Sequence, residues 1–289
     1  MSVVPARSEA MPRVVHSVVT LRKAVAAFHA KGERVAVVPT MGALHDGHLA
    51  LVEAGRREAE RIVVTIFVNP SQFAPSEDFS RYPRDFDGDL AKLAGLRTDL
   101  VFAPDVGTMY PKGFATRVTV SGVSEGLCGA MRPHFFGGVA TVVTKLLNQC
   151  GADVAMFGEK DYQQLLVVKR LAADLDIPTR ITGVPTVREA DGVAMSSRNV
   201  YLTPEQRRVA PELFATLNRV AAIACAGGNV ATAITEGIAS LGKAGFGPVD
   251  YLALCDAESL VPVVRLDRPG RVLGAAWLGG TRLIDNVPA

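Results

Sequence analysis

The chain has 289 residues, of which 48% are hydrophobic and 21% are charged, a composition typical of a globular protein with a sizeable core. Its 31 basic and 29 acidic residues leave a formal net charge of +2, which gives no general argument for nucleic acid or a membrane surface as a partner. The first residues carry charges and prolines where a signal peptide needs an apolar run, and no segment reaches the roughly 20 apolar residues of a membrane helix. The four cysteines lie far apart without a CxxC pair, so we expect reduced thiols in a cytoplasmic protein.

The first two thirds of the chain alternate short Val-rich runs with amphipathic segments. The runs predict strands and the amphipathic segments predict helices. Strands are expected at 34–40, 62–70, 99–103, 153–158 and 179–186, and helices at 48–62, 86–96, 137–150 and 162–175. Nearly continuous apolar strands alternating with helices indicate a Rossmann-like, doubly wound α/β fold whose parallel sheet is covered on both faces.

The character of the sequence changes after Arg198. A helix is predicted over 203–228, where Thr203 is a good cap and a proline follows it. A second helix over 230–243 and two strand-like segments at 249–256 and 271–285 complete the chain. This pattern predicts a smaller α+β domain.

The domain boundary follows from this change of pattern. We expect a Rossmann-like domain over residues 1–186 and a smaller C-terminal domain over 187–289. A small domain that closes over a binding cleft excludes water from it, and the hypothesis is that the smaller domain acts as such a lid.

The stretch MGALHDGHLALV, residues 41–52, places two histidines where a predicted strand gives way to a helix. Ligands of open parallel sheets bind at the carboxyl ends of the strands, and the unpaired amides at a helix amino terminus suit phosphate. Gly47 allows an anion close to the backbone, while His45 and His48 add imidazole donors. The alternative interpretation is that His45 and Asp46 only cap the helix and that His48 faces solvent.

A second donor-rich stretch, MSSRN at residues 195–199, precedes the helical C-terminal segment. A guanidinium forks onto phosphate oxygens and serine hydroxyls bond the remainder, which suits a polyphosphate. By itself the stretch is more typical of a turn with a solvated arginine. Together with the HxGH pattern at 45–48, it resembles the two-signature arrangement of enzymes that catalyse attack on the α-phosphate of ATP.

Five stretches taken together resemble the pantoate–beta-alanine ligase family (pantothenate synthetases), within the wider HxGH nucleotidyltransferase superfamily. In that family's order they are PTMGALHDGHLALV (39–52), FVNPSQFAPSEDFSRYPRD (67–85), FGEKDYQQL (157–165), VPTVREADGVAMSSRNVYL (184–202) and TRLIDN (281–286). The resemblance implies ATP-dependent condensation of (R)-pantoate with beta-alanine to pantothenate. The reaction proceeds through pantoyl adenylate and releases pyrophosphate and AMP.

The resemblance also implies catalytic and ATP-binding residues. His48 would be the acid toward the leaving phosphate, His45 a second donor, and Lys160 a counter-charge for phosphate; a neutral His48 that only donates a hydrogen bond is the alternative. The implied ATP-binding residues are Met41, Gly42, Ala43, Leu44, His45, Asp46, Gly47, His48, Gly158, Glu159, Lys160, Asp161, Val187, Met195, Ser196, Ser197 and Arg198.

Some of these residues also have plainer interpretations. By their letters alone, Lys160 and Asp161 are typical of an exposed surface pair at a loop. Val187 and Met195, expected at the adenine or the neighbouring backbone, are more often core residues.

Pantoate carries two hydroxyls and a gem-dimethyl group, so its site needs neutral amides and an apolar wall. Gln72 and Gln164 are the amides we expect, and the family uses the matching positions. Asn69, at the end of a predicted strand, is either a turn residue or a polar contact to the reacting groups, and we expect the contact.

ATP chemistry of this kind normally needs Mg²⁺, which takes oxygen ligands. Asp89 is the carboxylate expected to bind it. The resemblance implies an acidic residue just before this position and a glutamine three residues after it, whereas this chain has Gly88 and Lys92; the alternative is that Asp87 or Asp85 supplies the second carboxylate. The alternative for Asp89 is a solvated helix amino terminus.

Two other classes of function share these signatures. A nucleotidyltransferase acting on a phosphorylated small molecule would keep the nucleotide in its product, but its acceptor site should be richer in Arg and Lys. A non-catalytic nucleotide-binding module would not need His48, Lys160 or the two glutamines. The partners expected are therefore pantoate, beta-alanine and ATP, without nucleic acid or membrane, and the resemblance implies a homodimer.

Overall fold

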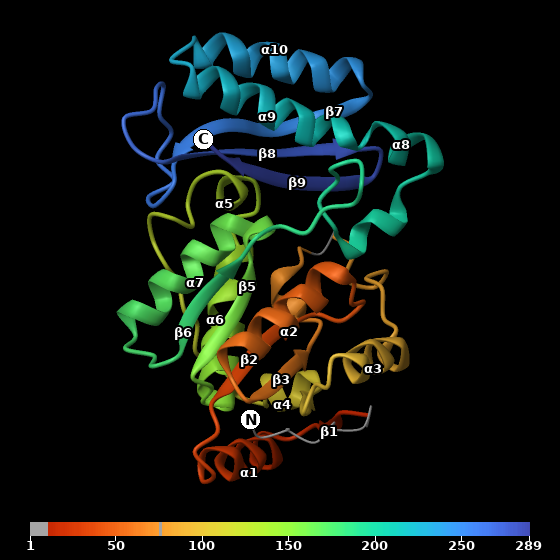
Figure 1. Ribbon diagram of the computed structural model, residues 1–289, viewed down its shortest axis with the longest axis vertical. Helices are drawn as coiled ribbons and strands as arrows, with labels where there is room; N and C mark the ends of the chain where they lie inside the picture. The colour runs from red at the N-terminus through yellow and green to blue at the C-terminus, as the bar shows by residue number, and fades with distance from the viewer. Residues whose placement is uncertain (1–10, 75–76) are drawn as a thin grey trace, which may run out of the picture. The chain divides into compact units, whose positions relative to one another are not determined.

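The computed structural model describes residues 11–74 and 77–289 of the chain (Figure 1). Residues 1–10 of the predicted first domain lie outside the described residues. The same holds for Pro75 and Ser76, which belong to the polar stretch at 67–85.

A six-stranded sheet forms the first layer of structure, in the order β1-β4-β3-β2-β5-β6, with every pairing parallel. This confirms the predicted doubly wound α/β fold. The strand at the amino end was not predicted, because three residues are too few to show a period. The strands are β1 (Arg13–Val15), β2 (Val35–Thr40), β3 (Arg61–Ile66), β4 (Leu100–Phe102), β5 (Val154–Gly158) and β6 (Arg180–Val184).

Helices cover this sheet because its strands are apolar on both faces. Successive strand residues point to opposite faces, and Ala36 and Val38 pack with α2 and α3 on one of them. Val35 and Val37 are equally buried on the other. The helices before β6 are α1 (Val18–His29), α2 (Asp46–Glu58), α3 (Phe86–Gly95), α4 (Val106–Met109), α5 (Cys128–Met131), α6 (Phe135–Cys150) and α7 (Tyr162–Asp174).

A separate three-stranded antiparallel sheet lies in the C-terminal part, in the order β7-β8-β9. One of its faces packs against two helices, which contribute Leu217 and Leu241 to a common core (Figure 1). The elements are α8 (Pro204–Val209), α9 (Pro211–Cys225), α10 (Val230–Lys243), β7 (Phe246–Asp256), β8 (Gly270–Leu278) and β9 (Thr281–Pro288).

Two predictions for this part were wrong. The single helix expected over 203–228 is α8 and α9, divided at Pro211, which lacks the amide hydrogen that a continuous helix needs. The single segment expected over 271–285 is a hairpin, because Leu278 pairs with Thr281 across a two-residue Gly-Gly turn.

The chain divides into two compact units that are not continuous in sequence. The first comprises the residues up to Thr119, Gly137–Gly158 and Val168–Val184, and the second comprises Val120–Phe136, Glu159–Val167 and Pro185–Ala289. A single boundary after residue 186 therefore differs from the observed division. The physical reason is packing: Leu127, Tyr162 and Leu166 lie against Cys255 and Leu273 of the antiparallel sheet.

Within the described part of the chain, every helix is too short or too polar to cross a bilayer. All four cysteines belong to this part, and each is a free thiol. Burial raises the pKa of Cys150 to about 12 and that of Cys255 to about 11. These two thiols therefore stay protonated at neutral pH.

Helix α6 approaches a short 3-10 turn, η1 (Pro70–Gln72), more closely than a side chain would allow. A β-carbon at Gly138 would collide with the carbonyl oxygen of Ser71, and the amide of Asn69 donates to the carbonyl oxygen of Gly138 at 3.2 Å. A β-carbon at Gly137, one residue earlier, would have nothing within 4 Å. The absence of a side chain at Gly138 therefore lets the helix backbone position η1.

We expect Gly138→Ala to lower the free energy of unfolding by about 1–3 kcal/mol, because backbone must move to admit the methyl group. Gly137→Ala is the matched control and should be neutral or slightly stabilising, since alanine favours the helix. Urea denaturation followed by circular dichroism measures both. Equal effects of the two substitutions would contradict the close packing at Gly138.

Candidate active site

The backbone between β2 and α2 adopts an unusual path. Gly42 and Ala43 have φ values of 79° and 50°, in the left-handed region that is costly for a residue with a side chain, by about 1–2 kcal/mol. A β-carbon at Gly42 would lie 3.1 Å from Oδ2 of Asp89 and 3.2 Å from Cγ2 of Ile66. The turn is therefore both strained and tightly enclosed.

Asp89 holds this turn. The side chain is 1% exposed, its Oδ2 accepts from the amide of Ala43 at 2.9 Å, and its Oδ1 accepts from the amide of Leu44 at 2.7 Å. Burial raises the pKa of Asp89, and the amides of Leu44 and Ala43 and the charge of Lys92 partly oppose that rise. Nζ of Lys92 donates to the carbonyl oxygen of Leu44 at 2.7 Å, so the α3 side chains bind both polar groups of Leu44.

These contacts do not fit the predicted role of Asp89 as a Mg²⁺ ligand. Both carboxylate oxygens already accept backbone hydrogen bonds, and a nearby ammonium group opposes a cation. A β-carbon at Gly88 would require the carboxylate of Asp85 to move from its present position. Among the residues that the structure describes, no group of three or more His, Cys, Asp or Glu side chains is placed to hold a metal ion.

His45 and His48 lie in the first turn of α2. His45 is the N-cap residue, and its amide donates to Nδ1 of His48 at 3.4 Å. The two rings are 4.1 Å apart between centroids. Because Nδ1 of His48 accepts a hydrogen bond, the neutral ring carries its proton on Nε2 and can donate from there.

The capping interpretation is thus correct for the backbone of His45, and Asp46 is an exposed first-turn acid. His48 is half-buried rather than solvent-facing. The residues Met41, Gly47 and His48 share this amino end of the helix, whose unpaired amides carry partial positive charge.

Asn69 and Gln72 bound the η1 turn after β3. Asn69 is 1% exposed, and its Oδ1 accepts from the amide and hydroxyl of Ser71 and from the hydroxyl of Tyr110, at 2.8 Å in the last case. These internal partners, with the bond to Gly138, show that Asn69 stabilises the turn, and its contact to reacting groups stays a prediction. Gln72 is half-buried at the end of the turn.

The second unit contributes the 3-10 turn η2 (Glu159–Asp161), which follows Gly158 at the end of β5. Nζ of Lys160 lies 3.8 Å from Oδ2 of Asp161, and the Lys160 side chain is 19% exposed. The pair is therefore only partly a surface pair. Oε2 of Glu159 accepts from the guanidinium of Arg271 at 3.2 Å.

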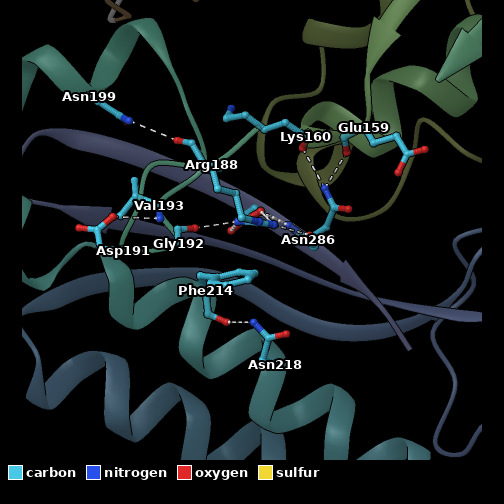
Figure 2. Close-up of polar contacts among 12 residues, drawn as sticks. Glu159, Lys160, Arg188, Asp191, Gly192, Val193, Asn199, Phe214, Asn218 and Asn286 are labelled. Carbon is cyan, nitrogen blue, oxygen red and sulfur yellow. Dashed lines mark hydrogen bonds and ion pairs between the residues drawn. The ribbon is translucent and has the colours of Figure 1, made fainter. Parts of the chain in front are cut away.

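Residues 187–195 form a narrow hairpin in the same unit (Figure 2). The amide of Met195 donates to the carbonyl oxygen of Val187 at 3.0 Å. Ser196 follows as the N-cap of a further 3-10 turn, η3 (Ser197–Tyr201), and its hydroxyl accepts from the amide of Arg198 at 3.3 Å. The predicted loop is thus a structured turn whose serines and arginine are half-buried.

Gln163 and Gln164 have different surroundings despite their identical side chains. Gln163 is buried, accepts from the amide of Cys128 at 3.0 Å and donates to the carbonyl oxygens of Val123 and Gly126. Gln164 is half-buried, and on a helix its side chain lies on a different face. Gln163 is therefore a structural residue, which leaves Gln164 as the candidate for a ligand.

Sequence reasoning missed three functional supports in the second unit. Arg188, Asp285 and Asn286 connect the hairpin and η2 to β9 (Figure 2). The motif TRLIDN drew attention to the last two, but nothing in its letters indicates their partners. Within the first unit, the structure brings residues 41–48 and η1 to the carboxyl ends of neighbouring strands, where Thr40 pairs with Ile66.

Comparison with known proteins agrees with this geometry. The pantothenate synthetase of Paramagnetospirillum magneticum is 59% identical over 95% of this chain and 96% of its own, and that of Rhodospirillum rubrum is 55% identical over 95% and 98%. The crystal structure of pantothenate synthetase from Thermus thermophilus superposes with a TM-score of 0.90 at 49% identity, covering 95% of this chain and 98% of that one.

A pantoate-beta-alanine ligase from Francisella tularensis, solved with beta-gamma ATP and beta-alanine, superposes with a TM-score of 0.81 at 30% identity, covering 96% and 97% of the two chains. The family model described as pantoate-beta-alanine ligase matches residues 13–288. The chain therefore belongs to the pantoate–beta-alanine ligase family.

Proposed function

We propose how the residues of this chain carry out the reaction of its family, the ATP-dependent condensation of (R)-pantoate with beta-alanine. In the first step the pantoate carboxylate attacks the α-phosphorus of ATP, and pyrophosphate leaves. In the second step the amine of beta-alanine attacks the acyl carbon of pantoyl adenylate, loses a proton, and AMP leaves. The observation that supports this assignment most directly is the histidine pair in the first turn of α2, which follows the central strand β2.

The amino end of α2 would bind the phosphates of ATP. The backbone amides of residues 41–48 and the imidazoles of His45 and His48 are donors for the charge that develops as pyrophosphate leaves. The hydrogen bond from the amide of His45 to Nδ1 favours a neutral His48 that donates from Nε2. An imidazolium would lose this bond, so we propose the hydrogen-bonding role for His48 rather than the acid role.

The second unit would supply further ATP ligands. Lys160 neutralises phosphate charge, and Ser196, Ser197 and Arg198 bind the β- and γ-phosphates. Asp161 accepts hydrogen bonds from the ribose hydroxyls. The nucleotide also contacts backbone or apolar atoms of Gly158, Glu159, Val187 and Met195. The partial exposure of Lys160 supports its availability to an anion.

Gln72 and Gln164 would bind the hydroxyls of pantoate, because neutral amides both donate to and accept from alcohols. Asn69 takes part indirectly, by fixing the turn that carries Gln72. Beta-alanine is the second acceptor substrate, as in the Francisella tularensis complex.

Magnesium, which ATP chemistry normally needs, would enter as the MgATP complex, held by phosphate oxygens. Asp89 is assigned to the backbone turn instead, on the contacts described above. We further propose a homodimer in the cytoplasm. The assembly rests on the family resemblance alone, and a reducing compartment fits the four free thiols.

The decisive experiment is isotope exchange between pyrophosphate and ATP with purified protein and magnesium, in the absence of beta-alanine. We expect exchange that requires pantoate, because the first step is reversible only when an acyl adenylate forms. A nucleotidyltransferase would instead yield a nucleotide-linked product and no free AMP when beta-alanine is added. Absence of pantoate-dependent exchange, despite measurable ATP binding, would rule out the proposed reaction.

His48→Gln should reduce this exchange by about 100-fold or more, as the loss of a preorganised donor does elsewhere. His29→Gln is the matched control, because His29 ends α1 and pairs only with Asp153 at 3.2 Å. It should leave the exchange rate unchanged. Equal activity of the two variants would remove His48 from the mechanism.

Asp89→Asn tests the turn assignment against the metal assignment. The NH₂ group of the new asparagine cannot accept a hydrogen bond, so one of the two backbone amides would lose its acceptor. Such an unsatisfied donor costs about 1–3 kcal/mol of stability. We expect a higher KM for ATP with no change in the magnesium concentration that gives half-maximal activity. Asp87→Asn, at an exposed position of the same helix, is the control. A marked increase in the magnesium requirement of Asp89→Asn alone would restore Asp89 as a metal ligand.

A further inference from the structure

Two consecutive residues of β9, Asp285 and Asn286, connect segments that are far apart in sequence. Both side chains are 5% exposed. Buried carboxylates and amides are costly unless every polar atom is bonded. Their partners therefore indicate what the pair does for the second unit.

The side chain of Asn286 binds the backbone of the η2 turn. Its Nδ2 donates to the carbonyl oxygens of Glu159 and Lys160, each at 2.9 Å, and its Oδ1 accepts from the guanidinium of Arg271 at 2.9 Å. Both hydrogens of the amide are used on successive carbonyls of one tight turn. An aspartate has the same shape but no such hydrogens.

Arg271 fixes the same turn from another side. Its guanidinium stacks on the ring of Tyr162, 3.7 Å from the centroid, and donates to Oε2 of Glu159 at 3.2 Å. Hydrogen bonds thus fix the carbonyl oxygens of Glu159 and Lys160 and the carboxylate of Glu159. The Lys160 side chain is left to its own ion pair with Asp161.

Asp285 binds the hairpin through Arg188. The guanidinium donates from both terminal nitrogens to the carboxylate, at 2.6 and 3.0 Å, and to the carbonyl oxygen of Asn286 at 3.3 Å. Oδ1 of Asp285 also accepts from the amide of Asn286 at 2.7 Å. A two-pronged pair of this kind sets orientation as well as position.

The hairpin beyond Arg188 is packed as one piece. Arg188 donates to the carbonyl oxygen of Gly192 at 3.0 Å and stacks on Phe214, which leaves no room for a side chain at Gly192. Asn199 donates to Glu189 and to the carbonyl oxygen of Ala194. The serines and arginine at 196–198 lie between these anchored residues, so their position follows from that of Arg188.

We infer that Asp285 and Asn286 are positioning residues for ATP, which fix η2 and the 187–198 segment relative to each other from one strand. The inference rests on the proposed function of those two segments as ATP ligands. Neither side chain needs to touch the nucleotide. Their effect is to hold Lys160 and Arg198 in the geometry that the triphosphate requires, and small displacements of such groups are costly in rate.

The test separates the two half-reactions. Pyrophosphate–ATP exchange with pantoate needs the full triphosphate, whereas synthetic pantoyl adenylate and beta-alanine react without the β- and γ-phosphates. We expect Asn286→Asp to raise the KM for ATP and to reduce exchange by about tenfold or more, with aminolysis of the adenylate reduced by less than about threefold. A residue with a merely structural role would lower both half-reactions together.

Asn218→Asp is the matched control for this substitution. Asn218 is exposed on α9, and its Nδ2 donates to the backbone carbonyl oxygen of Phe214 at 2.8 Å (Figure 2). It should leave both half-reactions unchanged. The control removes the same kind of bond from a carbonyl oxygen within helix α9.

Arg188→Lys provides a second variant should Asn286→Asp not fold. Lysine keeps the charge but loses the two-pronged pair and the stacking contact, so the same selective loss of exchange is expected. Arg219→Lys, which alters an exposed pair with Glu212 on α9, is its control.

An equal loss of both half-reactions, or no change in either, overturns the positioning role of the pair. If the unchanged chain shows pantoate-dependent exchange and the variants exchange at the same rate, this inference is overturned and the proposed function is not. Absence of pantoate-dependent exchange in the wild-type chain overturns the proposed function, and this inference with it.

Discussion

A buried carboxylate that accepts two successive backbone amides determines the path of the chain from β2 into α2. Without Asp89, the amides of Ala43 and Leu44 would be buried with no acceptor, and Ala43 would have no compensation for its left-handed conformation. The start of α2 follows from that turn. His45 therefore becomes the N-cap, and His48 takes the position where it accepts from the His45 amide. The conformation of the chain that leads into the helix therefore depends on the two hydrogen bonds of Asp89.

The same physical solution recurs wherever this protein needs irregular backbone. Chain segments that bind ligands cannot bond their amides and carbonyls within a sheet, so buried side chains must satisfy them. Asn69 does this for η1, Gln163 for residues 123–128, and Asn286 for η2. Each is a short amide that bonds at both its ends. Such residues are easily mistaken for ligand-binding groups, because they lie beside the ligand-binding segments and have the same chemistry.

The elements of the parallel sheet were predictable because their signal is local. The Val-rich run at β2 was recognised within one residue and α10 at both its ends, whereas α2 ends at Glu58, before the predicted end at residue 62. The misplaced elements depended on single residues: Pro211 divides one helix, and the Gly-Gly turn after Leu278 divides one strand. The unit boundary was not visible, because Tyr162 continues a helical pattern while packing on the antiparallel sheet.

The sequence by itself determined the fold class, the family and the segments that carry the chemistry, because periodicity and motif order are properties of the chain alone. Only the tertiary structure decided which polar side chains in these segments bond to the backbone of the protein. The sequence predicted that Asp89 and Asn69 bind ligands, and in the structure their side-chain oxygens accept hydrogen bonds from groups of the protein. Gln163 and Gln164 are identical in type, yet Gln163 is buried and bonded to backbone whereas Gln164 is half-buried. Hydrogen-bond partners of buried polar groups come from distant parts of the chain, such as Asn286 and Lys160, which no local pattern brings together.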